Sequence, residues 1–117
     1  MNASTATSAL AALAQESRLT VFRALVQAGS DGLAAGEIAA KTRIPPSSLS
    51  FHLKELSHSK LVQARPDGRF IYYAANFATM NALIAFLTEN CCGGAPEQCK
   101  PAAACDPATG KPTKVSA

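Results

Sequence analysis

Residues 44–56 read IPPSSLSFHLKEL, which is the pattern of an amphipathic helix. Leu49, Leu53 and Leu56 recur at helical spacing, so one face of the segment is apolar and suited to a protein core. Pro46 fits the first turn of a helix, where its missing N–H costs nothing, and the serines beside it can accept hydrogen bonds from the free amides of that turn. The segment is therefore predicted to be a helix that begins near Pro46.

The other face of this helix carries short polar and charged side chains. At about 100° per residue, the side chains that lie away from the leucines are those of Ser47, Ser50, Phe51, Lys54 and Glu55, with Ser48 and His52 at the flank of the leucine stripe. An ordinary surface helix has the same pattern. The sequence around the helix favours a second interpretation.

A shorter helix is predicted immediately upstream, over residues 33–42 (LAAGEIAAKT), and a turn of a few residues separates the two. Together they form a helix-turn-helix. In that motif the second helix enters the major groove of DNA and its N-terminal residues contact base edges. The residues at those positions here are Ser47, Ser48, Ser50 and Phe51.

Positive charge is concentrated around this motif. The whole chain has a net charge of +3, whereas residues 41–69 alone hold six basic and two acidic residues. Such a local surplus is expected where a protein contacts phosphates, although a solvated basic face is the simpler alternative. The basic residues are Lys41, Arg43, Lys54, Lys60, Arg65 and Arg69, and the acidic ones are Glu55 and Asp67.

A β-hairpin is predicted after the helix-turn-helix. Residues 61–65 and 70–74 are rich in strand-forming side chains, and the Asp-Gly pair within residues 66–69 indicates the turn between them. Arg65 and Arg69 bracket this turn. A hairpin in this position is a wing whose arginines can reach a phosphate or the minor groove, or it is a hairpin that only covers the core.

The remaining helices are predicted over residues 5–13, 15–29 and 77–90. The chain has the length of one domain, and its hydrophobic content of 48% is enough for a modest core. Because the first and last helices are apolar on most faces, we expect them to pack together across the twofold axis of a homodimer. A symmetric dimer also presents two recognition helices to successive major grooves. The predicted fold is mainly α with a small β-hairpin, a homodimeric winged helix-turn-helix over residues 1–90.

The composition changes after residue 90. Residues 91–117 hold four of the seven prolines, three of the seven glycines and all four cysteines, so we expect a flexible tail with no regular fold. The sequence shows neither an apolar run long enough to span a membrane nor a signal peptide, which predicts a cytoplasmic protein with reduced thiols. The cysteines are Cys91, Cys92, Cys99 and Cys105.

The order of these elements over residues 8–90, with the Ser-x-x-Ser-x-His-Leu-Lys pattern of residues 47–54 and the Asp-Gly wing, resembles the ArsR family of metalloregulatory repressors. The resemblance implies a homodimer that binds its operator when free of inducer and releases it when a metal or metalloid binds. By position, it implies DNA contacts from Ser47, Ser48, Ser50, Phe51 and His52, and wing contacts from Arg65 and Arg69. Lys54, on the same helix, is a further candidate for DNA contact.

Two metal sites known in the family are missing from this sequence. Residues 37–41 lack the Cys-Val-Cys pair of the best-known arsenic repressors, and residues 77–90 contain neither the Asp nor the His of the zinc-sensing branch. Other arsenic-responsive members have an adjacent cysteine pair just past the terminal helix and a further cysteine downstream. Cys91 and Cys92, with Cys99, are similar to that version.

Thiolates select soft ions. Arsenite and antimonite are three-coordinate thiophiles, so As(III) or Sb(III) held by Cys91, Cys92 and Cys99 is the predicted inducer complex, with Cys105 a possible substitute ligand. Alternatives are zinc bound by all four thiols, another soft metal, or thiol oxidation, although adjacent cysteines are a poor zinc knuckle. His52 and His58 are interpreted as hydrogen-bonding residues rather than ligands.

Two other classes of function compete with DNA binding. The sequence has no carboxylate pair, phosphate-binding loop or Ser/His/Asp arrangement, which argues against an enzyme and against an organic cofactor. A winged helix that binds protein instead of nucleic acid is the second rival. The basic surplus around the recognition helix argues against it.

Overall fold

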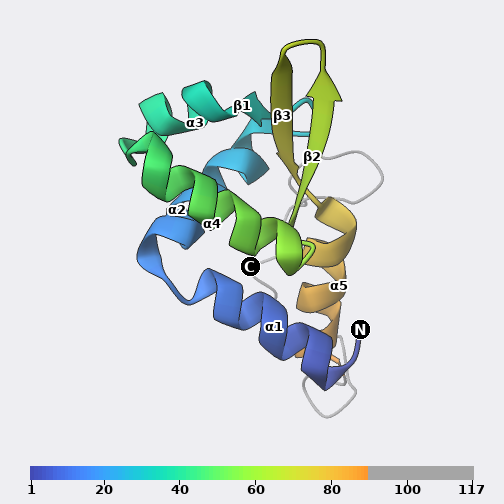
Figure 1. The fold of residues 1–117 in the computed structure, drawn as a ribbon. Coiled ribbons are helices and arrows are strands. Elements are labelled where there is room, and N and C mark those ends of the chain that lie inside the picture. Colours follow the sequence, from blue (N-terminus) through green and yellow to red (C-terminus); the bar gives the residue numbers. More distant parts are fainter. Residues whose placement is uncertain (90–117) are drawn as a thin grey trace, which may run out of the picture. The chain divides into compact units, whose positions relative to one another are not determined.

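The structure is a computed structural model that describes residues 1–89, of which Met1–Leu87 form one compact unit. This part of the chain forms five helices and a small three-stranded sheet (Figure 1). The predicted fold class, mainly α with a small β-hairpin, is confirmed. The elements are α1 (Ala3–Leu13), α2 (Glu16–Ala28), β1 (Leu33–Ala34), α3 (Ala35–Thr42), α4 (Pro46–His58), β2 (Val62–Asp67), β3 (Phe70–Ala75) and α5 (Phe77–Leu87).

Amide side chains fix the beginnings of three helices. The side-chain oxygens of Asn2, Gln15 and Asn76 each accept a hydrogen bond from the backbone N–H three residues later, at 2.8, 2.8 and 3.3 Å. An N-cap of this kind satisfies an amide that has no partner within the helix. Because Asn2 is the cap, α1 begins at Ala3, two residues before the predicted start.

Helix α4 ends in a Schellman motif. Lys60 adopts a left-handed conformation with φ 64°, the N–H of Leu61 donates to the carbonyl of Leu56 at 3.0 Å, and the N–H of Lys60 donates to that of Ser57, also at 3.0 Å. Leu56 and Leu61 are both fully buried. The motif therefore turns the chain sharply from α4 into the wing.

The sheet has three antiparallel strands in the order β1-β3-β2, where only the β2–β3 hairpin was predicted. Leu33 pairs with Tyr73 and Ala34 with Tyr72. The sequence interpretation was wrong at this point, because it placed residues 33–34 in the following helix. A strand of two residues is too short to show the alternation that identifies strands, so its pairing partner on β3 defines it.

The predicted hairpin is present, with its turn centred one residue later than the Asp-Gly pair. Asp67 pairs with Phe70, which leaves Gly68 and Arg69 as a two-residue loop, and Gly68 has φ 62°. Strand β2 runs on through Pro66. A proline is tolerated there because β2 is an edge strand of the sheet.

The core lies between the helices and the inner face of the sheet. The predicted leucine face of α4 is confirmed as part of it, whereas α1 contributes a stripe of alanines and leaves Leu10 exposed. In the part of the chain that the structure describes, no helix is long and apolar enough to cross a membrane. The core residues are Ala6, Ala9, Ala12, Val21, Phe22, Leu25, Ile38, Leu49, Leu53, Leu56, Leu61, Val62, Ala75 and Leu83.

Candidate nucleic-acid interface

The outer face of α4 is a continuous exposed surface. Five of the six residues predicted on this helix to contact DNA are exposed, and the aromatic ring among them, Phe51, is 57% exposed. The hydroxyl of Ser50 donates to the carbonyl of Pro46 at 3.1 Å, which holds it against the first turn. The exposed five are Ser47, Ser48, Ser50, Phe51 and Lys54.

His52 is the sixth residue of that set, and the structure places it differently. Its side chain is 9% exposed, and within the described residues its Nδ1 atom is buried without a hydrogen-bond partner. The ring packs edge-on to Phe51, with the ring centres 6.0 Å apart. Helical spacing predicted His52 at the flank of the leucine stripe, and the family resemblance implied a DNA contact. His52 instead follows Leu49 by three residues and precedes Leu56 by four, which places it within the stripe.

The turn of the helix-turn-helix depends on Arg43. This residue ends α3 in a left-handed conformation with φ 59°, and its N–H donates to the carbonyl of Ala39 at 2.8 Å. Pro45 is the N-cap of α4, and Pro46 occupies its first turn, as predicted. The two helices are therefore joined by a short connection that sets the direction of α4 relative to α3, as Figure 1 shows.

The basic residues around α4 all lie at the surface. Each of the six between residues 41 and 69 is exposed, whereas Glu55 is only half-exposed. Exposed cations of this kind are available to neutralise phosphates. They come from α3, the connection between the helices, α4, the end of its Schellman motif and the wing, and they are Lys41, Arg43, Lys54, Lys60, Arg65 and Arg69.

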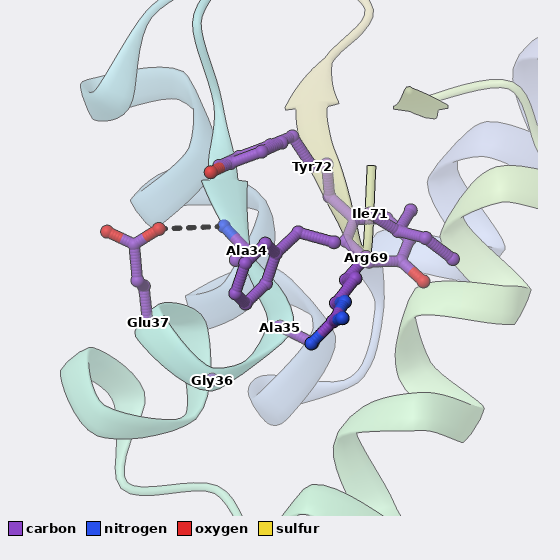
Figure 2. A pocket seen from close by; sticks show the side chains of 9 residues that line it. Ala34, Ala35, Gly36, Glu37, Arg69, Ile71 and Tyr72 are labelled. Carbon is purple, nitrogen blue, oxygen red and sulfur yellow. Dashed lines mark hydrogen bonds between the residues drawn. The ribbon is translucent and has the colours of Figure 1, made fainter. Parts of the chain in front are cut away.

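The two wing arginines have different surroundings. The guanidinium of Arg65 lies over the ring of Tyr72, 5.6 Å from its centre, and donates a hydrogen bond to the main-chain carbonyl of Asp31 at 3.2 Å. Arg65 therefore connects the wing to the loop before β1. Arg69 occupies the turn itself, and its side chain extends toward Ala35 at the start of α3 (Figure 2).

A shallow groove of about 660 Å³ lies between the wing and the start of α3 (Figure 2). On its α3 side, a carboxylate oxygen of Glu37 accepts a hydrogen bond from the N–H of Ala34 at 3.0 Å, which caps the helix. Sequence reasoning missed this groove because β1, which brings α3 against β3, was not predicted. Its lining residues are Ala34, Ala35, Gly36, Glu37, Arg69, Phe70, Ile71, Tyr72 and Tyr73.

The predicted metalloid ligands Cys91, Cys92 and Cys99, and the possible ligand Cys105, lie outside the described residues. Within residues 1–89, no three His, Cys, Asp or Glu side chains gather in a way that would hold a metal ion. His58 lies at the last position of α4, beside Glu55 and Arg18 in a small surface cavity.

Comparison with known proteins gives the family. A family described as "Helix-turn-helix domain" matches residues 13–63. The HTH-type transcriptional regulator YgaV of Escherichia coli is 31% identical over 91 residues, which cover 78% of this chain and 90% of YgaV. An ArsR-like transcriptional regulator from Rhodococcus sp. RHA1 has a similar structure, with a TM-score of 0.67, 25% identity, and coverage of 81% of this chain and 85% of that one. The chain belongs to the ArsR family of transcriptional regulators.

A second solved structure similar to this ArsR-family chain is a homodimeric winged helix-turn-helix DNA-binding domain from Mycobacterium bovis. It has a TM-score of 0.59 and 27% identity, with coverage of 74% of this chain and 81% of that domain. The ArsR-family chain also matches two other curated relatives, but it spans only 63% and 60% of their length. The similarity therefore covers the winged helix-turn-helix body.

Proposed function

We propose that this chain is a homodimeric repressor that binds operator DNA through α4 and the wing, and that it leaves the operator when As(III) or Sb(III) binds the thiolates of Cys91, Cys92 and Cys99. The observation that carries the DNA-binding part is the exposed polar face of α4, together with the six exposed basic residues between residues 41 and 69. Membership in the ArsR family supports the same function.

The exposed face of α4 supports a division of contacts. Ser47, Ser48, Ser50 and Phe51 lie in its first two turns, where a recognition helix meets base edges. Hydroxyl groups hydrogen-bond to bases, and an aromatic ring makes apolar contact with a thymine methyl group. Lys54 lies further along the same exposed face, where its ammonium group is suited to a phosphate.

The wing and the other cations would supply phosphate contacts, which give affinity without sequence preference. Arg69 is better placed for this than Arg65, because the guanidinium of Arg65 already contacts Tyr72 and Asp31. His52 is left out of the proposed contacts, since its side chain is buried. Its role is packing beneath the recognition face.

Helices α1 and α5 are the proposed dimer interface. They contact each other, and their exposed apolar side chains include Leu10 and Leu87. Burying such side chains against a second copy would stabilise the dimer by about 25 cal/mol for each Å² of apolar surface removed from water. A twofold dimer would then present two α4 helices to successive major grooves.

The chemistry of the thiol set supports the proposed inducer. Three thiolates satisfy a three-coordinate As(III) or Sb(III) ion, and soft sulfur ligands prefer such ions to hard ones. Helix α5 ends at Leu87, and Cys91 is the fourth residue after it in the sequence. Closing a chelate next to a helix of the dimer interface would change the spacing of the two α4 helices. An inducer that binds the off-operator state more tightly must weaken DNA binding by the same factor as its preference for that state.

The DNA-binding part is tested by selection of duplexes from a random pool with the full-length protein, followed by gel shift at several salt concentrations. We expect a palindromic sequence with half-sites one helical turn apart. Arg69→Ala should weaken binding to every sequence and lower the salt slope by about 0.9 for each phosphate that the variant no longer neutralises. Ser50→Ala and Phe51→Ala should change base preference, by about 1–3 kcal/mol for each base pair read. Selection that enriches no sequence would contradict the proposal.

The inducer part is tested on the protein–operator complex by titration with arsenite, antimonite, zinc and cadmium. Arsenite and antimonite should release the DNA, and the double variant Cys91→Ser/Cys92→Ser should bind DNA normally but not release it. Cys105→Ser is the matched control and should still release, because three thiolates remain. Release of the double variant by arsenite would refute the assignment, and release by zinc or by an oxidant alone would favour those signals instead.

A further inference from the structure

The outer face of the wing carries a row of stacked side chains. Arg65 and Tyr72 are cross-strand partners, so their side chains lie on the same face of the hairpin, and Phe70 shares that face because it is two residues from Tyr72. Arg65 lies over the Tyr72 ring, and the rings of Tyr72 and Phe70 have centres 6.5 Å apart. The row therefore runs from the loop before β1 to the tip of the wing.

The last member of this row is exposed. Phe70 is 60% exposed, the largest exposed fraction among the large hydrophobic side chains of the described residues. It cannot serve the core, which lies on the opposite face of the sheet with Val62 and Ala75. Large apolar side chains exposed at the tip of a hairpin indicate a binding role for that tip.

We infer that Phe70 is an apolar wedge that the wing inserts between two base pairs in the minor groove of the operator, with Tyr72 as the positioning residue that holds its ring. This rests on the proposed DNA-binding function. Apolar side chains that enter the minor groove partly unstack a base step and bend the duplex toward the major groove. The contacts of Tyr72 with Arg65 on one side and Phe70 on the other would keep the wedge in place before binding.

The charges at the tip are consistent with a nucleic-acid partner. Arg69 is exposed and precedes Phe70 in the turn, so a phosphate beside the tip would meet a cation. Asp67, the cross-strand partner of Phe70, places one negative charge at the same tip. A protein partner for the same patch would need no such cation. The wing also follows the proposed major-groove helix α4 directly, through the Schellman motif, so both could contact one duplex.

A wedge reads the deformability of DNA rather than its hydrogen-bonding groups. Pyrimidine–purine steps such as TA and CA unstack easily, whereas A-tracts are stiff. The wild-type protein should therefore prefer operators with a flexible step at the position where the wing lies. Loss of the wedge should remove this preference without changing the salt slope, because phenylalanine carries no charge.

The test uses the full-length protein and the duplex that it selects, with 2-aminopurine placed in turn at each adenine of the segment that footprinting assigns to the wing. Fluorescence of 2-aminopurine reports unstacking, and energy transfer between dyes on the duplex ends reports bending. The wild-type protein should raise the fluorescence at one step and bend the duplex. Phe70→Ala should abolish both signals. It should also weaken binding by about tenfold, because the contacts of the inserted ring more than offset the few kcal/mol that unstacking costs.

Three variants separate a wedge from a general effect on the hairpin. Phe70→Leu should keep the unstacking signal, because leucine is also a wedge residue. Ile71→Ala is the matched control, since Ile71 is 47% exposed at the same tip but leaves β3 in a different direction from Tyr72 (Figure 2), and it should behave as wild type. Tyr72→Leu should cause a larger fractional loss of the 2-aminopurine fluorescence signal than of the affinity for the duplex.

Wild-type binding with no rise in fluorescence at any step would overturn the wedge and leave the proposed function intact. A loss in Phe70→Leu equal to that in Phe70→Ala would also overturn it. Failure of the wild-type protein to retain any duplex would overturn the proposed function, and the wedge with it.

Discussion

Gly32 lies so close to the main chain of Tyr73 that a Cβ atom at Gly32 would overlap the Tyr73 carbonyl oxygen. Gly32 also has φ 75°, a conformation that residues with a side chain adopt only with strain. The close approach lets the chain enter β1 and pair with β3. One glycine thus permits the strand that the sequence did not reveal.

Gly32→Ala is therefore expected to lower the free energy of unfolding by about 2 kcal/mol or more, since backbone strain and steric overlap act together. Gly36→Ala is the control, because a Cβ at Gly36 meets nothing within 4 Å and the residue lies in α3. That change should be neutral or stabilising by up to about 1 kcal/mol. Urea unfolding followed by circular dichroism measures both, and equal stabilities would contradict the expected role of Gly32.

Arg65→Ala should destabilise the protein by about 1 kcal/mol, because it removes an exposed cation–π contact and the hydrogen bond to the Asp31 carbonyl. Arg69→Ala is its partner experiment, and we expect it to leave the unfolding free energy within about 0.5 kcal/mol of wild type. Thermal and urea unfolding report the difference. The idea that Arg65 anchors the wing fails if the two variants are equally stable.

The proposed dimer interface predicts different outcomes for two leucines of equal exposure. Leu10 on α1 and Leu19 on α2 are each 42% exposed. Leu10→Glu should place a charge in the interface and raise the dimer dissociation constant by at least about tenfold, whereas Leu19→Glu should leave it unchanged. Sedimentation equilibrium measures both. A monomeric wild type, or dissociation by the Leu19 variant alone, would place the interface elsewhere.

His52→Leu tests whether the histidine faces the core or the DNA. Leucine has a similar volume and no buried polar atom, so the variant should be as stable as wild type or more stable by about 1 kcal/mol. DNA affinity should stay within about twofold, which is less than the effect of one base contact. Fluorescence anisotropy with the selected duplex measures the affinity, and a tenfold loss would restore His52 to the DNA-contacting set.

The elements with strong periodicity were predictable from the sequence. The leucines of α4, the proline at its start and the turn signals of the hairpin each express one local rule; the structure follows the first two, and it places the hairpin turn one residue later than the Asp-Gly pair. The ends of helices were less predictable. Asn2 moved the start of α1, and α5 ends at Leu87 rather than at residue 90, since end positions depend on single hydrogen bonds.

The features that the sequence did not predict depend on contacts between distant residues. Strand β1 exists because β3 is beside it, and the groove next to α3 follows from that pairing. Arg65 and Arg69 look equivalent in the sequence, but their surroundings differ because Tyr72 and Asp31 lie next to Arg65 only. His52 was placed at the flank of the leucine stripe by counting about 100° per residue, and that count is too coarse to decide whether a side chain at the edge of the stripe is buried or exposed.

Ala34 belongs to two elements at once, as the last residue of β1 and the N-cap of α3. No spacer therefore separates the sheet from the helix-turn-helix, and a tilt of the hairpin is transmitted to α3 without slack. A hybrid that takes its hairpin from a relative would therefore need to take β1 as well, because a foreign hairpin paired with the native β1 would change the orientation of α3.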